Sequence, residues 1–122
     1  MSTPGAVLAA KNLDFPDSVR RFAHGHMDIV HVAGSTVGRM VFEPGWRWSV
    51  HMAPAAGTDS CRVLHTGVVL SGRLAVRMDD GTQAVAGPGD VFVIEPGHDG
   101  WVLGEESCVL LDWSGAGDYA RR

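Results

Sequence analysis

The chain has 122 residues, of which 45% are hydrophobic and 20% are charged, and this is the composition of one soluble globular domain. No apolar run approaches the roughly 20 residues that a transmembrane helix needs, so the sequence excludes a spanning helix. The formal net charge is −4 and the 10 Lys and Arg residues are dispersed. The chain therefore lacks the basic patch of a protein that binds nucleic acid or an anionic membrane.

The N-terminal segment has no basic start, and its apolar stretch is too short for a secretory signal. We therefore expect a cytoplasmic protein. The two cysteines, Cys61 and Cys108, can pair in principle, but a reducing compartment favours free thiols.

One helix is expected, over residues 16–22, because Pro16 suits a first helical position and Val19, Phe22 and Ala23 recur at helical spacing. Every other element is predicted as a strand, because short runs rich in Val and aromatic residues are bounded by Gly, Pro or Asp. These strands cover residues 27–32, 37–42, 46–52, 65–70, 74–78, 83–86, 91–94, 101–103 and 108–113. Their frequent turn signals predict an all-β sandwich or barrel. The ends, residues 1–6 and 115–122, are expected to be loosely held.

The predicted strand over residues 46–52 raises a question of side-chain direction. If His51 points inward, then Trp46, Trp48, Val50 and Met52 face outward, because side chains alternate along a strand. An exposed apolar stripe needs a cover, and we expect either a second copy, making a homodimer, or residues 10–35 to supply it. The alternative is a twisted or bulged strand whose two Trp side chains fill the interior.

Two glycine-bounded segments carry the most specific spacing. Five residues separate Gly45 from His51, and six separate His65 from Gly72. The second segment places Gly89, Glu95 and Gly97 in order, followed by His98. This arrangement resembles the two sequence motifs of the cupin superfamily, and the resemblance spans about residues 37–113. The sequence around the motifs is similar to that of small bacterial single-domain cupins.

The chain departs from the cupin motifs at several positions. His65 stands where the family has Glu, and Ala53 stands where it has a second His. Glu95 replaces the motif Pro, and Gly100 occupies the place of the last His, two residues after His98. About eight extra residues also separate His51 from His65. The resemblance implies an all-β cupin jelly-roll barrel, a double-stranded β-helix, as a single domain over residues 1–122.

The resemblance also implies a metal centre. The candidate ligands are His51, His65 and His98, which lie on or next to three different predicted strands, near the motif positions for ligands. Cys61 is a candidate fourth ligand if the chain turns at residues 57–60. Imidazole ligands favour a divalent transition metal such as zinc, iron or nickel over magnesium or calcium.

Other side chains have a weaker case for a site. Arg47 can hold a carboxylate in a two-pronged way or pair with a nearby Glu, and Trp48 and Trp101 are candidates to line a substrate pocket. We interpret the remaining candidates as structural: His24 and His26 as a solvated turn, His31 as a strand residue and Cys108 as core.

Two functions are compatible with this sequence. The first is a metal-dependent enzyme acting on a small organic molecule, by dioxygenation if the metal is iron, or by isomerisation, cyclisation or elimination if the metal is a Lewis acid. The second is a non-catalytic binding or sensory module, which the loss of the second motif His and of the Glu favours.

Overall fold

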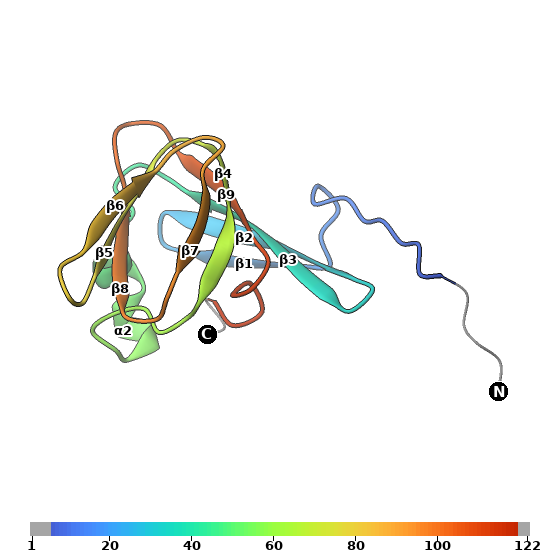
Figure 1. Cartoon of the computed structure of the whole chain (residues 1–122), viewed down its shortest axis with the longest axis horizontal. Helices are drawn as coiled ribbons and strands as arrows, with labels where there is room; N and C mark the ends of the chain where they lie inside the picture. The colour runs from blue at the N-terminus through green and yellow to red at the C-terminus, as the bar shows by residue number, and fades with distance from the viewer. Residues whose placement is uncertain (1–5, 120–122) are drawn as a thin grey trace.

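The computed structural model describes residues 6–119, which form two antiparallel β-sheets and two four-residue helices (Figure 1). The larger sheet has the strand order β1-β2-β3-β9-β4-β7. Its strands are β1 (Ser18–Phe22), β2 (Gly25–Val32), β3 (Ser35–Phe42), β4 (His65–Ser71), β7 (Val91–Ile94) and β9 (Cys108–Asp112). The smaller sheet, in the order β6-β5-β8, contains β5 (Leu74–Met78), β6 (Gln83–Ala86) and β8 (His98–Val102). The strands of residues 6–119 thus form two separate sheets. The expected all-β architecture is present, but the sheets do not close into one hydrogen-bonded barrel.

Burial alternates along the strands that face the interior. In β8 and β9 every second residue is buried, beginning with His98 and Cys108, and in β4 the same alternation runs from His65 to Val69. The same alternation buries Asp112 at the end of β9. Because successive side chains of a strand point to opposite faces, these polar residues are directed into the protein together with the apolar core.

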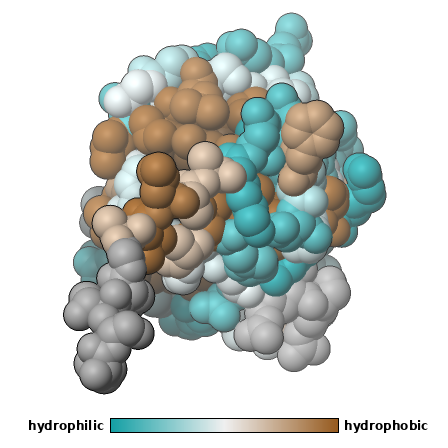
Figure 2. Space-filling model, turned by 90° about the vertical axis from the view of Figure 1, so that its right-hand side faces the viewer, coloured by the Kyte–Doolittle hydropathy of each residue, from teal (hydrophilic) through white to brown (hydrophobic). Residues whose placement is uncertain are grey.

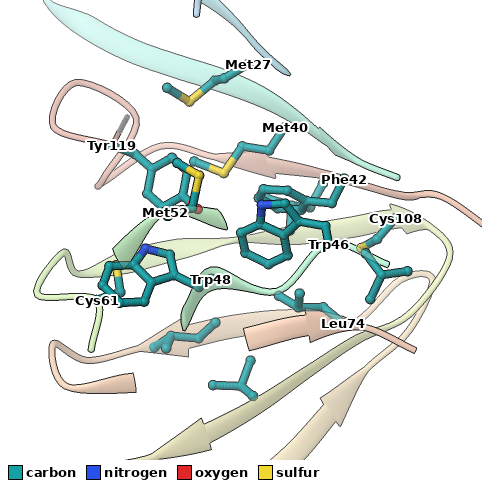
Figure 3. Close-up of a cluster of buried hydrophobic side chains, with 14 of the residues drawn as sticks. Met27, Met40, Phe42, Trp46, Trp48, Met52, Cys61, Leu74, Cys108 and Tyr119 are labelled. Carbon is teal, nitrogen blue, oxygen red and sulfur yellow. The ribbon is translucent and has the colours of Figure 1, made fainter. Parts of the chain in front are cut away.

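The core lies between the sheets and is rich in aromatic and sulfur-containing side chains (Figure 3). Phe42 and Trp46 stack with their ring centroids 4.0 Å apart. Met27 and Val69 are fully buried beside them in the same cluster. Burial of a large apolar side chain stabilises a fold by about 1.5–3 kcal/mol, so this cluster is a main source of stability.

The prediction of a strand over residues 46–52 was wrong. The segment forms α1 (Trp48–His51), which is followed at once by α2 (Ala53–Ala56). The helical turn buries Trp48 and Met52 while Val50 stays 60% exposed, and Trp46 is buried just before the helix. The two Trp side chains therefore fill the interior, as the alternative interpretation held. The apolar stripe that motivated a homodimer does not exist, and association of two copies stays a prediction.

The prediction of a helix over residues 16–22 was also wrong. Residues 18–22 form β1, which pairs antiparallel with β2 in the register Ser18↔Ile29 to Phe22↔Gly25. The edge of β2 pairs with Ser18 to Phe22 along their whole length, and one or two isolated helical turns cannot compete with that ladder.

The C-terminal end is held more firmly than we expected from sequence. Ala116 and Tyr119 are 1% and 4% exposed, so residues 115–119 pack on the body. Residues 1–5 and 120–122, which share the prediction of loose ends, lie outside the described residues. None of the helices in residues 6–119 is long and apolar enough to cross a membrane.

Apolar side chains do reach the surface elsewhere. Figure 1 shows the N-terminal arm, residues 6–15, leading away from the sheets, and Figure 2 views the molecule from that side, where apolar patches border a hydrophilic band. The exposed apolar residues with the largest exposed fractions are on the arm and on β7: Val7, Leu8, Phe15, Val91 and Val93.

Candidate metal centre

Three buried side chains converge between the sheets. Cys61, His65 and His98 each offer one ligand atom, and these atoms all lie within 4.8 Å of one another. The three residues are only 2%, 7% and 5% exposed. A buried set of two imidazoles and a thiol is unusual in a hydrophobic core unless the groups bind each other or an ion.

Backbone hydrogen bonds position Cys61. Helix α2 ends at Gly57, whose φ of 73° turns the chain back toward the sheets. The N–H of Cys61 then donates to the carbonyl of His98, and the N–H of Gly97 donates to the carbonyl of Cys61, both at 2.7 Å. The turn that Cys61 needs in order to approach His65 is therefore present, and it also joins Cys61 to the start of β8.

A buried carboxylate orients His65. Its Nδ1 donates to Asp112 Oδ2, and its Nε2 lies 3.6 Å from Cys61 Sγ. Asp112 is 0% exposed, and its Oδ1 accepts hydrogen bonds from the N–H groups of Ser114 and Gly115. The carboxylate thus fixes the imidazole with Nε2 directed toward the thiol, which is the arrangement that supports metal-binding histidines in proteins.

A backbone carbonyl orients His98 in a similar way. Its Nδ1 donates to the carbonyl of Glu95 at 2.7 Å, and this leaves Nε2 free to bind. The rings of His65 and His98 meet edge to face, with their centroids 5.4 Å apart. Both imidazoles therefore have Nδ1 engaged by a carboxylate or carbonyl oxygen, and both also hydrogen-bond the Cys61 thiol.

The electrostatics of the cluster favour an ionised thiol. Burial raises the pKa of Cys61, but hydrogen bonds from His65 and His98 outweigh it and lower the pKa to about 6. Burial lowers the pKa of His65, but the hydrogen bonds to Asp112 and Cys61 outweigh it and raise the pKa to about 9. A thiolate is the form of cysteine that binds metals and attacks electrophiles.

These shifts predict the pH at which the thiol ionises in metal-free protein. The absorbance of a thiolate is expected to rise with a midpoint near pH 6, because above its lowered pKa Cys61 is ionised. Burial raises the pKa of Cys108 to about 11, so this second thiol stays protonated over the same range. An ultraviolet pH titration of the wild type and of the Cys61→Ser variant checks the assignment. A midpoint near pH 9, or one that persists in Cys61→Ser, contradicts it.

Two cavities meet at the cluster. An inner cavity of about 30 Å³ is lined by His65 and His98, and an outer cavity of about 310 Å³ is lined by Cys61. Trp48 and Tyr119 line both of them. The three candidate ligands therefore line neighbouring cavities, His65 and His98 the inner one and Cys61 the outer one.

The structure does not bring every predicted site residue to the cluster. His51 lies on α1, where its Nδ1 accepts a hydrogen bond from the N–H of Arg47 at 3.0 Å. Its ring lies against His24, with the centroids 4.5 Å apart. Trp48 lines both cavities. Arg47 instead covers the Trp101 ring at 4.3 Å, and neither of these two side chains is among the residues that line the two cavities.

The other predicted structural residues lie apart from the cluster. His24 is exposed with a positive φ of 61°, which fits the expected turn, whereas His26 falls on β2 beside Asp28 at 3.7 Å. His31 contacts Thr36 on the neighbouring strand at 3.0 Å. Cys108 is a free, fully buried thiol, as expected for a core residue.

Sequence reasoning missed two residues of the site. Asp112 carried a usable signal, because it occupies the inward phase of an apolar strand with Cys108 and Leu110. A carboxylate at such a position needs a buried partner. Tyr119 carried no motif signal, and it reaches the cluster only because residues 115–119 fold back onto the sheets.

Comparison with known proteins rests on structure alone, because the sequence matches no protein-family model and no curated protein. A protein of unknown function from Rhizobium leguminosarum superposes with a TM-score of 0.57 and 24% identity, covering 75% of this chain and 81% of that one. The EutQ protein of Clostridium difficile gives a TM-score of 0.53 at 13% identity, covering 78% and 70%.

The oxalate decarboxylase of Lactobacillus farciminis, solved as a formate complex, gives a TM-score of 0.62 at 16% identity. The match covers 95% of this chain and 35% of the decarboxylase, so this chain corresponds to one part of that larger protein. Oxalate decarboxylase is a cupin and EutQ is cupin-like. The chain therefore has a cupin-like fold.

Proposed function

We propose that the protein binds a divalent transition metal through Cys61, His65 and His98 and acts as a metal-dependent enzyme on a small organic molecule. The observation that carries this proposal is the convergence of the three donors, with the second nitrogen of each imidazole already engaged by Asp112 or by the Glu95 carbonyl. Catalytic metal sites in proteins typically have three protein ligands and one open position.

One pair of donors has the spacing that such an ion requires, and all three lie within 4.8 Å of one another. With metal–ligand bonds of about 2.0–2.3 Å, two donors of one tetrahedral centre lie roughly 3.3–3.7 Å apart. Cys61 Sγ and His65 Nε2 are 3.6 Å apart, which is within this range. One thiolate and two imidazoles suit zinc, iron(II) or nickel and do not suit magnesium or calcium. A metal bound here would supply Lewis acidity or, if it is iron, oxygen chemistry.

The residues around the metal ligands have separate tasks. Asp112 holds His65 in the tautomer whose Nε2 is free, and the Glu95 carbonyl does the same for His98. Trp48 and the other apolar residues of the inner cavity exclude bulk water from the open side. The reaction classes that this arrangement supports are dioxygenation, isomerisation, cyclisation and elimination.

Paired cysteine variants test the metal ligands. We expect Cys61→Ser to lower bound metal per chain to about one tenth or less of the wild-type value at limiting metal, because a serine hydroxyl replaces a thiolate ligand. Cys108→Ser, at a buried site outside the cluster, should keep the wild-type metal content. Elemental analysis of untagged protein, before and after dialysis against a chelator, gives both values. Equal metal content in the two variants would exclude Cys61 as a ligand.

A non-catalytic binding or sensory module is the second candidate, and the small volume of the inner cavity, about 30 Å³, favours it. Cobalt(II) substitution distinguishes the two functions. If the site is catalytic, azide should bind the open position and change the visible spectrum of the cobalt protein. A spectrum that stays the same at saturating azide would indicate a closed site that serves structure or sensing.

A further inference from the structure

Two buried hydrogen-bond donors have no partner in the described chain. They are the indole Nε1–H of Trp46 and the hydroxyl of Tyr119. The residues are 3% and 4% exposed, so neither group is solvated from outside. A buried donor that makes no hydrogen bond destabilises a fold, and native proteins satisfy nearly all of them. Two such donors in one core suggest that the missing partner is a ligand.

The two donors line the same space. Trp46 and Tyr119 both contribute to the inner cavity, together with His65 and His98 of the metal centre. The Tyr119 ring packs edge-on against the His65 imidazole, with the centroids 5.3 Å apart. Figure 3 shows the hydroxyl end of Tyr119 directed into the buried cluster. A group in this cavity can therefore contact the donors and the metal centre together.

Neither donor is free to turn away. The Trp46 indole is stacked on Phe42 at 4.0 Å, which fixes the direction of its N–H. The Arg20 guanidinium binds the carbonyls of Ala116, Gly117 and Tyr119, the last at 2.5 Å, and this holds the C-terminal turn that carries the tyrosine. The protein thus keeps two donors in place before any ligand arrives, which reduces the entropic cost of binding.

The chemistry of the donors limits the ligand. An indole N–H can donate but cannot accept, so its partner must be an acceptor such as a carbonyl or carboxylate oxygen. The inner cavity, about 30 Å³, has room for roughly two water-sized groups, which is the size of such a head group. The body of a larger molecule can occupy the outer cavity of about 310 Å³, which shares Trp48 and Tyr119 with the inner one.

We infer that Trp46 and Tyr119 form the acceptor-binding subsite of the metal centre, and that the substrate is a small organic acid or carbonyl compound. Its oxygen receives hydrogen bonds from both side chains in the inner cavity, while its carbon skeleton extends toward the outer cavity past Cys61. This inference rests on the proposed metal-dependent function, and it adds the substrate class to it.

Proton–nitrogen correlation spectra of the zinc-loaded protein test the inference, because each of the 4 Trp residues gives one indole N–H signal. Trp46→Phe identifies the signal of Trp46. Benzoate is the probe, and toluene, which has a similar shape but no acceptor, is its control. We expect benzoate to move the Trp46 indole signal downfield until it saturates, and toluene to leave the signal in place.

Two variants separate ligand binding from structure. Tyr119→Phe should weaken benzoate binding about tenfold, the effect of losing one hydrogen bond of roughly 1.4 kcal/mol. It should also keep the wild-type zinc content and the thermal stability of the ligand-free protein, because the hydroxyl has no protein partner to lose. Trp113→Phe, at a position that is 46% exposed, should bind benzoate as the wild type does.

The result that would overturn the inference is a zinc-loaded protein that does not bind benzoate, or binds it without moving the Trp46 signal. An affinity of Tyr119→Phe equal to that of the wild type would overturn it as well. A wild-type protein that takes up no zinc, yet binds benzoate through Trp46, would instead contradict the metal centre and leave the acceptor subsite standing.

Discussion

Replacing His65 with alanine is expected to abolish metal binding and to destabilise the metal-free protein by about 3–5 kcal/mol. The loss of metal follows from the place of His65 as the proposed ligand between Cys61 and Asp112. The loss of stability has a separate cause. Asp112 is 0% exposed, and without the imidazole its carboxylate keeps two backbone N–H donors but has no positive partner. An uncompensated buried charge is among the most destabilising defects in a folded protein.

His51→Ala is the matched control for this prediction. His51 stands at a cupin-motif position, but the structure places it on α1, half-buried against His24. We expect this variant to keep its metal and to lose about 1 kcal/mol or less of stability, as is usual away from a buried polar network. Elemental analysis and urea unfolding of the metal-free proteins measure both quantities. Loss of metal in His51→Ala equal to that in His65→Ala would favour the motif position over the observed cluster.

Asp112→Asn is expected to weaken metal binding by about 10–100-fold while the protein still folds. The amide oxygen of asparagine can continue to accept from the N–H groups of Ser114 and Gly115. Its NH₂ group would then face His65 Nδ1 and would require that nitrogen to accept a hydrogen bond. The imidazole proton would move to Nε2, which is the atom proposed to bind the metal. The variant therefore blocks a ligand without removing it.

The control for this effect is Glu95→Gln. His98 is oriented by the backbone carbonyl of Glu95, so a change of the exposed side chain leaves that hydrogen bond in place. Competition with a chromophoric chelator measures the affinities of the two variants and of the wild type. Wild-type affinity in Asp112→Asn, or an equal loss in Glu95→Gln, contradicts an orienting role for Asp112.

Most of the strands could be predicted from sequence, because their Val-rich runs are short and end at turn residues. The run Asp79-Asp80-Gly81 is an example: Gly81 has a φ of 93°, and the segment joins β5 to β6 as a hairpin. The prediction of a strand over residues 46–52 failed because the apolar pattern of this segment fits both the period of a strand and that of a helix. Trp46, Trp48 and Met52 alternate as in a strand, but Trp48 and Met52 also lie on one side of a helix, and the structure adopts the helix.

The candidate site was predictable to the extent that its residues lie on strands. His65 and His98 begin β4 and β8, where the inward phase is fixed by the neighbouring apolar residues. The position of Cys61 depended on a loop, and sequence could show only that a turn was available. His51 lies away from the cluster because its segment forms a helix in place of the expected strand. Tyr119 was beyond reach, since its position depends on the long-range contact with Arg20.

The ligand atoms come from both sheets and from the loop between them, and this has a mechanical consequence. His65 belongs to the larger sheet and His98 to the smaller one, and no backbone ladder joins these two sheets among residues 6–119. An ion bound by both histidines and Cys61 would act as a crosslink that resists separation of the layers. Such an ion binds the folded chain better than the unfolded one. Each tenfold increase in free metal above the dissociation constant therefore adds about 1.4 kcal/mol to the free energy of unfolding. The supply of metal in the surroundings would then set how long each folded molecule lasts.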